Sequence, residues 1–283
     1  RDSVASRGLG DVYKRQMNNT DINTRVGWYS KEVTEATSPE GFGQAGENGT
    51  WGGSGLVFPR IQGADPCGEV VAVGPEADTS LLNQRVIVDP WIREPQESNH
   101  RDRVGYLGSE RDGGFAQYCT APAINAYPIE SPLSDAELAS FPCSWATAEH
   151  MLTRPGLEAG ETLVVTGASG GVGTALVQLA KLRGAKVVAV TSSSKADAVS
   201  ALGADAVVDR MGDDLVVAVT SAAAGPVDLL ADVGGGADFA PLLDVVLRCG
   251  RYATAGAIAG PVGDLDLRTR YLNDLELYGC TVY

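Results

Sequence analysis

The residues best suited to chemistry form a glycine-rich segment, Thr166-Gly167-Ala168-Ser169-Gly170-Gly171-Val172-Gly173. The segment follows an apolar run and precedes Leu176 and Leu179, which lie at helical spacing from Val172. A helix N-terminus offers backbone N–H groups and the positive end of the helix dipole, and glycines let a pyrophosphate approach closely. We therefore predict that residues 166–173 bind a dinucleotide; the alternative is a glycine-rich turn that holds no ligand.

The residues after the next predicted strand, 186–190, bear on which dinucleotide binds. A carboxylate there would hydrogen-bond the ribose 2′-hydroxyl of NAD. The sequence instead reads Thr191-Ser192-Ser193-Ser194-Lys195. Hydroxyls and a cation suit a 2′-phosphate, which a carboxylate would repel. We expect NADP(H), with Ser192, Ser193 and Lys195 as contacts; the alternative for Lys195 is an ordinary solvated lysine near a helix start.

The pattern after Gly160 predicts the elements that must hold this turn. Strand–helix alternation of this kind predicts a doubly wound α/β domain whose parallel sheet is covered on both faces. Loops at the carboxyl ends of such strands line a nucleotide crevice, so Val233, Gly234, Ala255 and Gly256 join the expected cofactor contacts. The predicted strands are residues 162–166, 186–190, 206–208, 227–230 and 252–255.

The first half of the chain has a different pattern. A polar, charged segment, 91–112, is expected to form an exposed excursion. Ser134 is a candidate N-cap for a helix that begins at Asp135, and the domain boundary is expected near Arg154. A glycine-rich stretch, 38–55, is either a lid or binding loop or a disordered insertion. A small β-rich domain is predicted from the short β-rich runs 69–74, 84–89, 115–119 and 126–129.

The composition excludes several classes of function. The 283 residues include 22 Lys and Arg against 36 Asp and Glu, and this formal net charge of −14 opposes binding to nucleic-acid phosphates. No apolar run approaches the roughly 18 residues of a membrane span. Five cysteines include no C-x-x-C pair, so we expect a reduced, cytoplasmic chain without a disulfide framework. Two histidines exclude a three-His metal site.

Both ends of the sequence suggest a fragment of a longer protein. Residues 1–16 show no clear period and resemble a translated vector or adapter scar, so we expect a non-native leader and leave them out of the fold prediction. The alternative is a genuine flexible tail. The last residues, 280–283, are predicted to lie inside a strand.

Three segments resemble a known family: Asn18-Asn19-Thr20-Asp21 with Arg25-x-Gly27-x-Tyr29, residues 63–74 (GADPCGEVVAVG), and residues 168–173 (ASGGVG). They resemble motifs of the medium-chain dehydrogenase/reductase superfamily, closest to its zinc-free quinone oxidoreductase-like branch. The resemblance spans roughly residues 17–283. It implies a GroES-like catalytic domain over 17–153, without its first strands, and a Rossmann domain over 154–283, truncated at its end. It also implies an active site in the cleft and a homodimer of the full-length protein.

The same superfamily includes zinc alcohol dehydrogenases, whose catalytic metal is held by a Cys, a His and a later Cys. The matching positions here are Asn18, Ala64 and Cys143, so one ligand of three is present, whereas Zn²⁺ needs three protein ligands. The segment that matches the structural-zinc lobe contains no cysteine. We therefore expect no zinc; the alternative is an improvised site built from Asp65, Cys67 and Cys143.

The resemblance implies hydride transfer from NADPH to a quinone or an activated C=C or carbonyl substrate, with orientation and hydrogen bonds in place of a metal. It places Asn18 and Tyr29 near the substrate or nicotinamide; the alternatives are that Asn18 caps a turn and that Tyr29 only packs. It places Thr147 beside the nicotinamide. His150 is either a proton donor or a partly buried helix residue. The alternative functions are an NAD(P)-dependent alcohol dehydrogenase of the zinc type and a nucleotide-binding protein without turnover.

Overall fold

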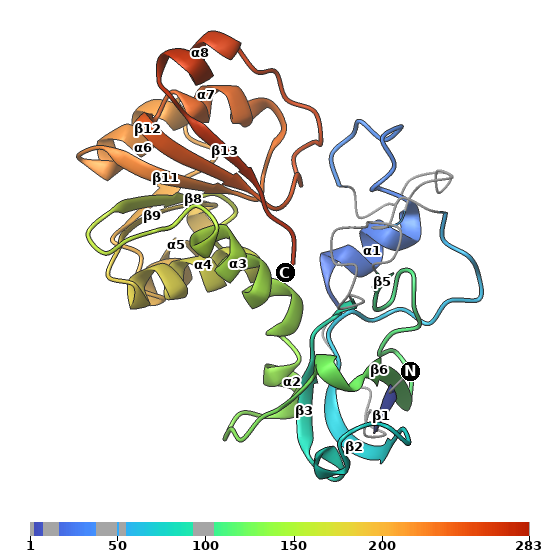
Figure 1. Cartoon of the computed structure of the whole chain (residues 1–283). Helices are drawn as coiled ribbons and strands as arrows, with labels where there is room; N and C mark the ends of the chain where they lie inside the picture. The colour runs from blue at the N-terminus through green and yellow to red at the C-terminus, as the bar shows by residue number, and fades with distance from the viewer. Residues whose placement is uncertain (1–2, 8–16, 38–49, 51–54, 93–104, 283) are drawn as a thin grey trace. The chain divides into compact units, whose positions relative to one another are not determined.

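The structure is a computed structural model that describes residues 3–7, 17–37, 50, 55–92 and 105–282 (Figure 1). The chain divides into two compact units. Unit 1 comprises Arg1–Val33 and Ser38–Cys143, and unit 2 comprises Thr34–Thr37 and Ser144–Tyr283. Among the described residues, no helix is long and apolar enough to cross a membrane. The glycine-rich stretch 38–55 lies outside the described residues except for Thr50 and Gly55.

Unit 1 is built on a five-stranded antiparallel sheet of order β6-β1-β2-β3-β7. Buried and half-buried residues alternate along β3, as expected for a strand with one face on a core. Val70, Val86, Val88 and Leu107 form that core. The strands are β1 (Ser3–Arg7), β2 (Cys67–Val73), β3 (Arg85–Val88), β6 (Tyr118–Pro122) and β7 (Ala126–Pro128); β4 (Trp91–Ile92) pairs with β5 (Gly105–Tyr106); the 3₁₀ helices are η1 (Thr79–Leu81) and η3 (Ala123–Asn125).

Two segments of unit 1 pack in ways that their sequence did not indicate. β1, at residues 3–7, pairs with β2 on one side and β6 on the other and so completes the sheet. The prediction that 91–112 is exposed is wrong at Tyr106 and Leu107, which are each 1% exposed, whereas Arg111 and Asp112 are exposed. Apolar residues within this charged segment pack into the unit, and the average polarity of the segment conceals them. Residues 93–104 lie outside the described part of the chain.

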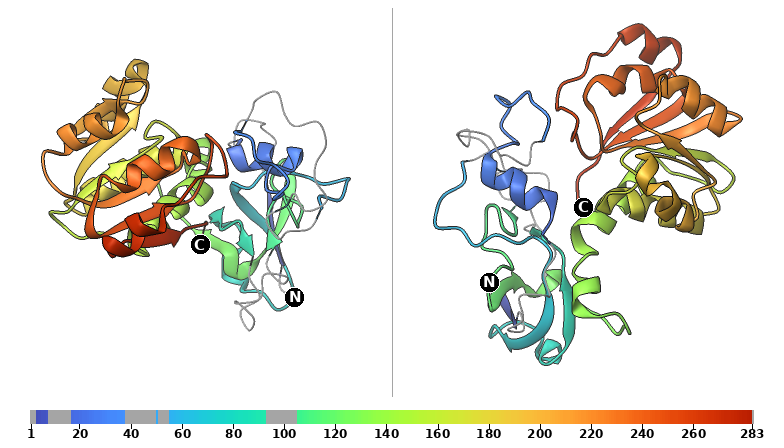
Figure 2. Two further views of the ribbon diagram at one scale, coloured as in Figure 1. Left: turned by 90° about the horizontal axis from the view of Figure 1, so that it is seen from above. Right: turned by 180° about the vertical axis from the view of Figure 1, so that it is seen from behind.

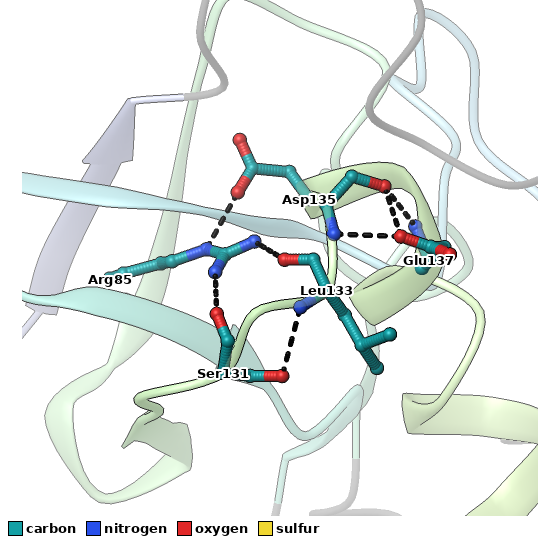
Figure 3. Close-up of polar contacts among 6 residues, drawn as sticks. Arg85, Ser131, Leu133, Asp135 and Glu137 are labelled. Carbon is teal, nitrogen blue, oxygen red and sulfur yellow. Dashed lines mark hydrogen bonds and ion pairs between the residues drawn. The ribbon is translucent and has the colours of Figure 1, made fainter.

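An arginine clamp fixes the chain where it leaves the sheet (Figure 3). Arg85 on β3 donates from Nε to Asp135 Oδ1 at 2.7 Å, and from its other nitrogens to the carbonyls of Ser131 and Leu133 at 3.0 and 2.5 Å. The predicted N-cap is confirmed: Ser134 and Glu137 form a capping box that starts α2 (Asp135–Leu138). The clamp and the cap together fix the route from β7 to α2.

Unit 2 is built on a six-stranded parallel sheet of order β10-β9-β8-β11-β12-β13. Helices lie on both faces, as Figures 1 and 2 show. The strands are β8 (Thr162–Val165), β9 (Lys186–Thr191), β10 (Ala206–Asp209), β11 (Val227–Asp232), β12 (Val246–Thr254) and β13 (Glu276–Gly279); the helices are α3 (Pro142–Thr153), α4 (Gly171–Leu182), α5 (Ala196–Ala201), α6 (Leu215–Ala223), α7 (Phe239–Leu243) and α8 (Leu267–Leu272), with 3₁₀ helices η4 (Ser193–Lys195) and η5 (Gly236–Asp238).

Alternate residues of the sheet enter two separate cores. On β8, Leu163 and Val165 pack into the core that contains α4, while Val164 packs into the core that contains α7. This confirms the predicted doubly wound Rossmann domain, because only a sheet covered on both faces buries every residue of a strand.

Two boundaries in unit 2 differ from the sequence-based expectation. Met151 and Leu152 of α3 are part of the core beneath α4, so the unit begins at Ser144 rather than near Arg154. The final strand is β13, and Cys280–Val282 follow it outside the sheet. Cys280 is held there by its N–H, which donates to the Thr254 carbonyl at 2.7 Å.

Candidate functional site

The turn between β8 and α4 requires glycine at two positions. Gly167 has φ +59°, and a Cβ there would lie 2.5 Å from Val233 Cγ2. A Cβ on Gly173 would lie 2.6 Å from Ala168 Cα and 2.8 Å from Ala168 C, and closer still to the Gly167 carbonyl oxygen. These neighbours are mostly backbone and cannot rotate away. The two glycines therefore bring the start of α4 against the end of β8.

The same turn exposes backbone amides at the start of α4. Gly170 is the N-cap and supplies no capping side chain, and the Thr174 N–H donates to the Gly170 carbonyl at 2.8 Å. In any α-helix the preceding amides, here those of Gly171, Val172 and Gly173, have no intrahelical acceptor. Gly167, Gly170 and Gly171 are exposed, and a Cβ on Gly170 would meet only the Gly167 carbonyl, at 3.4 Å. This part of the turn fits a pyrophosphate.

One predicted contact, Ala168, supports the turn from behind. Ala168 is fully buried, and its N–H donates to the Val190 carbonyl at 3.1 Å, so it fixes the turn and does not face outward. Ser144 on α3 lies so close to the turn that a Cβ on Gly171 would be 2.7 Å from Ser144 Oγ. Thr147, one helical turn further along α3, is also buried.

The loops after β8, β11 and β12 meet at the carboxyl edge of the sheet. The Thr166 N–H donates to the Ala231 carbonyl at 3.0 Å, and the Ala255 N–H donates to the Asp232 carbonyl at 3.3 Å. A Cβ on Gly256 would lie 3.0 Å from the Val233 carbonyl oxygen. The structure thus brings together the predicted contacts Thr166, Val233, Gly234, Ala255 and Gly256. It also shows that the buried Thr166 hydroxyl bonds Asp232 and does not face outward.

The end of β9 presents a polar, exposed surface. Ser193, Ser194 and Lys195 are exposed, and Ser192 Oγ lies 3.2 Å from Ser194 Oγ. The Arg210 N–H donates to the Thr191 carbonyl at 2.8 Å, which places a second cation at the same edge of the sheet. Sequence reasoning missed Arg210, although it lies two residues after the predicted strand 206–208. The parallel pairing of Asp209 with Thr191 brings it there.

In unit 1, Asn18 is the N-cap of α1 (Asn19–Val26). Its Oδ1 accepts from the Thr20 N–H at 3.2 Å, and its own N–H donates to Asp21 Oδ2 at 3.0 Å. Its Nδ2 donates to Asp65 Oδ2 at 3.1 Å. The amide of Asn18 is therefore engaged on both sides, which matches the alternative role of a cap.

Four residues linked by hydrogen bonds include the N-cap of α1, and we name them the Asp65 cluster: Asn18, Asp65, Tyr106 and Cys143. Asp65 is 3% exposed, and its Oδ1 accepts from the Cys143 N–H at 2.7 Å. The Tyr106 hydroxyl donates to Cys143 Sγ at 3.1 Å. Burial raises the pKa of Asp65 to about 7, opposed by the hydrogen bonds from Cys143 and Asn18. Burial also raises the pKa values of Cys143 and Tyr106, so both stay protonated at neutral pH.

Tyr29 joins the same end of α1. Its hydroxyl lies 2.8 Å from Thr20 Oγ1, and either atom can donate. Its ring packs edge-on against Trp28, with centroids 5.6 Å apart. Asn18 and Tyr29, both predicted from the resemblance, therefore meet at Thr20. Sequence reasoning did not single out Thr20; its place two residues after an N-cap was the available signal.

The residues at the expected zinc positions do not fit a metal. Ala64 is fully buried and has no ligand atom, and Asp65 and Cys143 are already bonded to each other and to Asn18 and Tyr106. Within the described ranges, no three or more His, Cys, Asp or Glu residues are grouped so that they could hold a metal. The alternative site is also unsuitable, because Cys67 packs in an apolar cluster with Leu138 and Ala139.

His150 has a structural contact in unit 2. Its Nδ1 lies 2.7 Å from the Thr281 carbonyl oxygen, and the residue is half-buried on α3. Arg154, just beyond the same helix, donates to the Gly279 carbonyl. These two contacts hold the segment after β13, which is consistent with the alternative of a partly buried helix residue.

Comparisons with known proteins cover both units. A zinc-binding dehydrogenase family model matches residues 171–283, and an alcohol dehydrogenase GroES-like domain model matches residues 16–131. A solved structure from Sinorhizobium meliloti 1021, named as a candidate alcohol dehydrogenase, is 43% identical with a TM-score of 0.81 and covers 99% of this chain and 73% of that one.

Two curated relatives are more distant. An NAD-dependent alcohol dehydrogenase of Sulfolobus acidocaldarius is 27% identical over 227 residues, which are 73% of this chain and 65% of the relative. An acryloyl-coenzyme A reductase of Metallosphaera sedula is 31% identical over 161 residues, 54% of this chain and 48% of the relative. The chain thus spans less than two thirds of the length of these relatives.

Proposed function

This chain belongs to the medium-chain dehydrogenase/reductase superfamily, and on that premise we propose that it is an NADPH-dependent oxidoreductase of small molecules. Its substrate is a quinone or a compound with an activated C=C or carbonyl group, and no metal takes part. The observation that supports this most is the turn at residues 167–173. Two of its glycines leave no room for a side chain, and its exposed amides suit a pyrophosphate.

The proposed cofactor site uses the carboxyl edge of the unit 2 sheet. The amides of Gly171 and Val172, at the start of α4, hold the pyrophosphate. The loops at 233–234 and 255–256 are small enough for the rest of the dinucleotide to approach the backbone. Thr147, buried on the helix that packs against the turn, is proposed to lie beside the nicotinamide. When bound, the dinucleotide supplies the hydride.

NADP(H) is proposed over NAD(H) because of the charge at the end of β9. The exposed Ser193 and Lys195 offer a hydroxyl and a cation, and Arg210 adds a second cation at the same edge. The carboxylate of Asp209, the residue paired with Thr191, accepts a hydrogen bond from the Met211 N–H at 3.0 Å. The relative from Sulfolobus acidocaldarius is named for NAD, which makes NAD(H) the alternative.

The proposed substrate groups lie at the start of α1. Thr20 and Tyr29 form a hydroxyl pair in which either oxygen can donate, and such a pair can present a proton to a substrate carbonyl oxygen. Asn18 then acts as a positioning residue, because its cap fixes the first turn of α1 that contains Thr20. A carbonyl conjugated to the reacting C=C spreads the arriving charge, so hydrogen bonds suffice where alcohol oxidation would need a Lewis acid.

Two alternatives remain open to test. The names of several relatives suggest an alcohol dehydrogenase, and the name of the family model over residues 171–283 suggests one that binds zinc. The buried Ala64 and the bonded Asp65 cluster favour a metal-free enzyme. The acryloyl-coenzyme A reductase relative is named for a conjugated C=C substrate, which favours the activated C=C among the proposed substrates. A nucleotide-binding protein without turnover is the remaining alternative.

We also propose a cytoplasmic homodimer for the full-length protein. The reduced cysteines support the compartment. β13 is an edge strand of the unit 2 sheet, and an edge strand can pair with a second copy. Sedimentation of the full-length protein tests the assembly, and a monomer at micromolar concentration would contradict it.

A fluorescence titration with NADPH and NADH tests the proposed function. We expect NADPH to bind at least tenfold more tightly, and then to be oxidised by a member of an enone and quinone panel. Equal affinities would contradict the 2′-phosphate assignment. Binding of neither dinucleotide would overturn the reductase proposal. Tight NADPH binding without turnover on any substrate would favour the nucleotide-binding alternative.

A further inference from the structure

A buried carboxylate, Asp232, connects three strands at the carboxyl edge of unit 2. Asp232 ends β11 and is 1% exposed. Its Oδ1 accepts from the Thr166 hydroxyl, directly after β8, and its Oδ2 accepts from the Tyr252 hydroxyl on β12. The N–H groups of Gly234 and Gly235 donate to the same two oxygens at 2.7 and 3.1 Å. Figure 1 shows β8, β11 and β12 side by side in the sheet.

These contacts lie where the sheet reverses its order. The chain leaves β8 for α4, which packs on one face, and leaves β11 for α7, which packs on the other. In doubly wound sheets the crevice for a dinucleotide opens between two such strands. Thr166 and Asp232 stand on its two sides, and the Val233 N–H also donates to Thr166 Oγ1 at 3.1 Å.

Asp232 has no acceptor capacity left for a ligand. A carboxylate offers about four acceptor positions, and the four donors named above occupy two on each oxygen. Burial and the nearby Asp232 charge raise the pKa of Tyr252, so its hydroxyl keeps its proton and stays a donor. Asp232 therefore acts only through the loops that it bonds.

The loop after β12 is connected through the same segment. The Ala259 N–H donates to the Gly234 carbonyl at 2.8 Å, and the Gly236 N–H donates to the Gly260 carbonyl at 3.0 Å. Gly235 and Gly236 have positive φ, so only glycine follows this path without strain. A shift of the Gly234–Gly235 amides would therefore move the loop after β12 as well.

We propose that Asp232 is a positioning residue that holds the Gly167 turn and the Gly234–Gly235 loop at the spacing that a dinucleotide needs. The inference rests on the proposed function, because it assumes that NADPH binds at this edge. The inference makes one prediction: a change of one group in Asp232, which does not touch the ligand, loosens both loops and weakens the binding of NADPH.

Asp232→Asn is the sharpest perturbation, because it keeps the shape and replaces one oxygen with an NH₂ group. Whichever way the amide lies, its NH₂ faces one hydroxyl and one glycine N–H. The hydroxyl can rotate to accept, but the N–H cannot. One half-buried glycine N–H therefore loses its acceptor, and the loop that contains it is held less tightly.

Asp228→Asn is the matched control. Asp228 lies near the other end of β11, and its Oδ2 accepts from the Thr162 N–H of the same neighbouring strand at 2.8 Å. The variant changes the same chemical group between the same two strands, remote from the loops. Tyr252→Phe is a second test that keeps the carboxylate, in case Asp232→Asn does not fold.

Amide hydrogen exchange of the ligand-free chain and NADPH fluorescence titration are the two readouts. In Asp232→Asn we expect faster exchange in residues 166–173 and 233–236, unchanged exchange in β9, and NADPH affinity about tenfold weaker. Tyr252→Phe should move both readouts in the same direction by less. Asp228→Asn should leave the exchange of both loops and the NADPH affinity within twofold of the original chain.

Three outcomes would overturn the inference. Wild-type affinity and exchange in Asp232→Asn would show that the bonds position nothing. An equal loss in Asp228→Asn, or faster exchange throughout the sheet, would show a general effect on stability. If the original chain bound neither dinucleotide, the proposed function and this inference would both fall, which distinguishes that failure from the other two.

Discussion

Substitution of Gly173 by alanine tests the central feature of the proposed site. A Cβ at this position would lie 2.6 Å from Ala168 Cα and 2.8 Å from Ala168 C, and ordinary contacts begin at 3.4 Å. It would approach the Gly167 carbonyl oxygen even more closely. Because these atoms are backbone, the first turn of α4 must move away from the end of β8 by about an ångström.

That displacement sets the expected size of the effect. A misplacement of about 1 Å at a binding or catalytic site costs on the order of a hundredfold. Overpacking of a core costs about 1–3 kcal/mol, which corresponds to a Tm lower by roughly 3–10 °C for a unit of this size. We therefore expect Gly173→Ala to fold, to melt earlier and to bind NADPH about a hundredfold more weakly.

NADPH fluorescence titration and thermal unfolding measure the two effects, and Gly225→Ala is the matched control. Gly225 is exposed in unit 2, and a Cβ there would meet only the Ala223 carbonyl oxygen, at 3.9 Å. The control should keep its NADPH affinity and its Tm. If Gly173→Ala bound NADPH as tightly as the original chain, the close packing of α4 on β8 would not be what forms the site.

Three further predictions concern charge and metal. Lys195→Ala should lower the affinity for NADPH about tenfold and leave the affinity for NADH within twofold, as measured by titration. An equal loss of affinity for both would contradict the 2′-phosphate contact. Burial in the folded chain raises the pKa of Asp65 from its ordinary 3.8 to about 7. The protonated Asp65 contributes its full stability to the fold below pH 4, and this contribution is lost as the pH rises to 7. The advantage of Asp65→Asn over the original chain in free energy of unfolding should therefore grow by up to about 4 kcal/mol across that range, and a difference that stays flat in urea titrations would show that Asp65 is not held protonated. Activity should survive dialysis against a chelator, and a loss that zinc restores would reverse the metal-free proposal.

The Asp65 cluster shows how the residue types at positions 18 and 64 change the hydrogen bonds that their neighbours form. With Asn18 where the zinc enzymes have a cysteine, the side chain caps α1 and donates to Asp65. With Ala64 in place of a histidine, no imidazole competes for Asp65. Asp65 then accepts from the backbone of Cys143, whose thiol accepts from Tyr106. The residues at and beside the positions of the zinc ligands thus form a hydrogen-bond network.

Local signals in the sequence predicted much of the architecture. The alternation of apolar runs and helical stretches predicted the doubly wound domain, which the six-stranded parallel sheet confirms. Ser134 marked the start of α2, and the structure confirms it as the N-cap, with Glu137 completing a capping box. Both features depend on residues within a few positions of each other, so the sequence contains them explicitly. The expectation of an exposed segment at 91–112 failed around Tyr106, because the composition was averaged over the segment.

The sequence alone therefore determined the glycine turn and the strand pattern, because each depends on residue type and short spacing. Only the tertiary structure decided which polar groups meet. Asp232 bonds Thr166 across 66 positions, and Asp65 bonds Cys143 across 78. It also decided that the Asn18 side chain caps α1 and that Arg210 lies at the same edge of the sheet as Lys195. Such partners are set by strand order and register, and no local pattern encodes them.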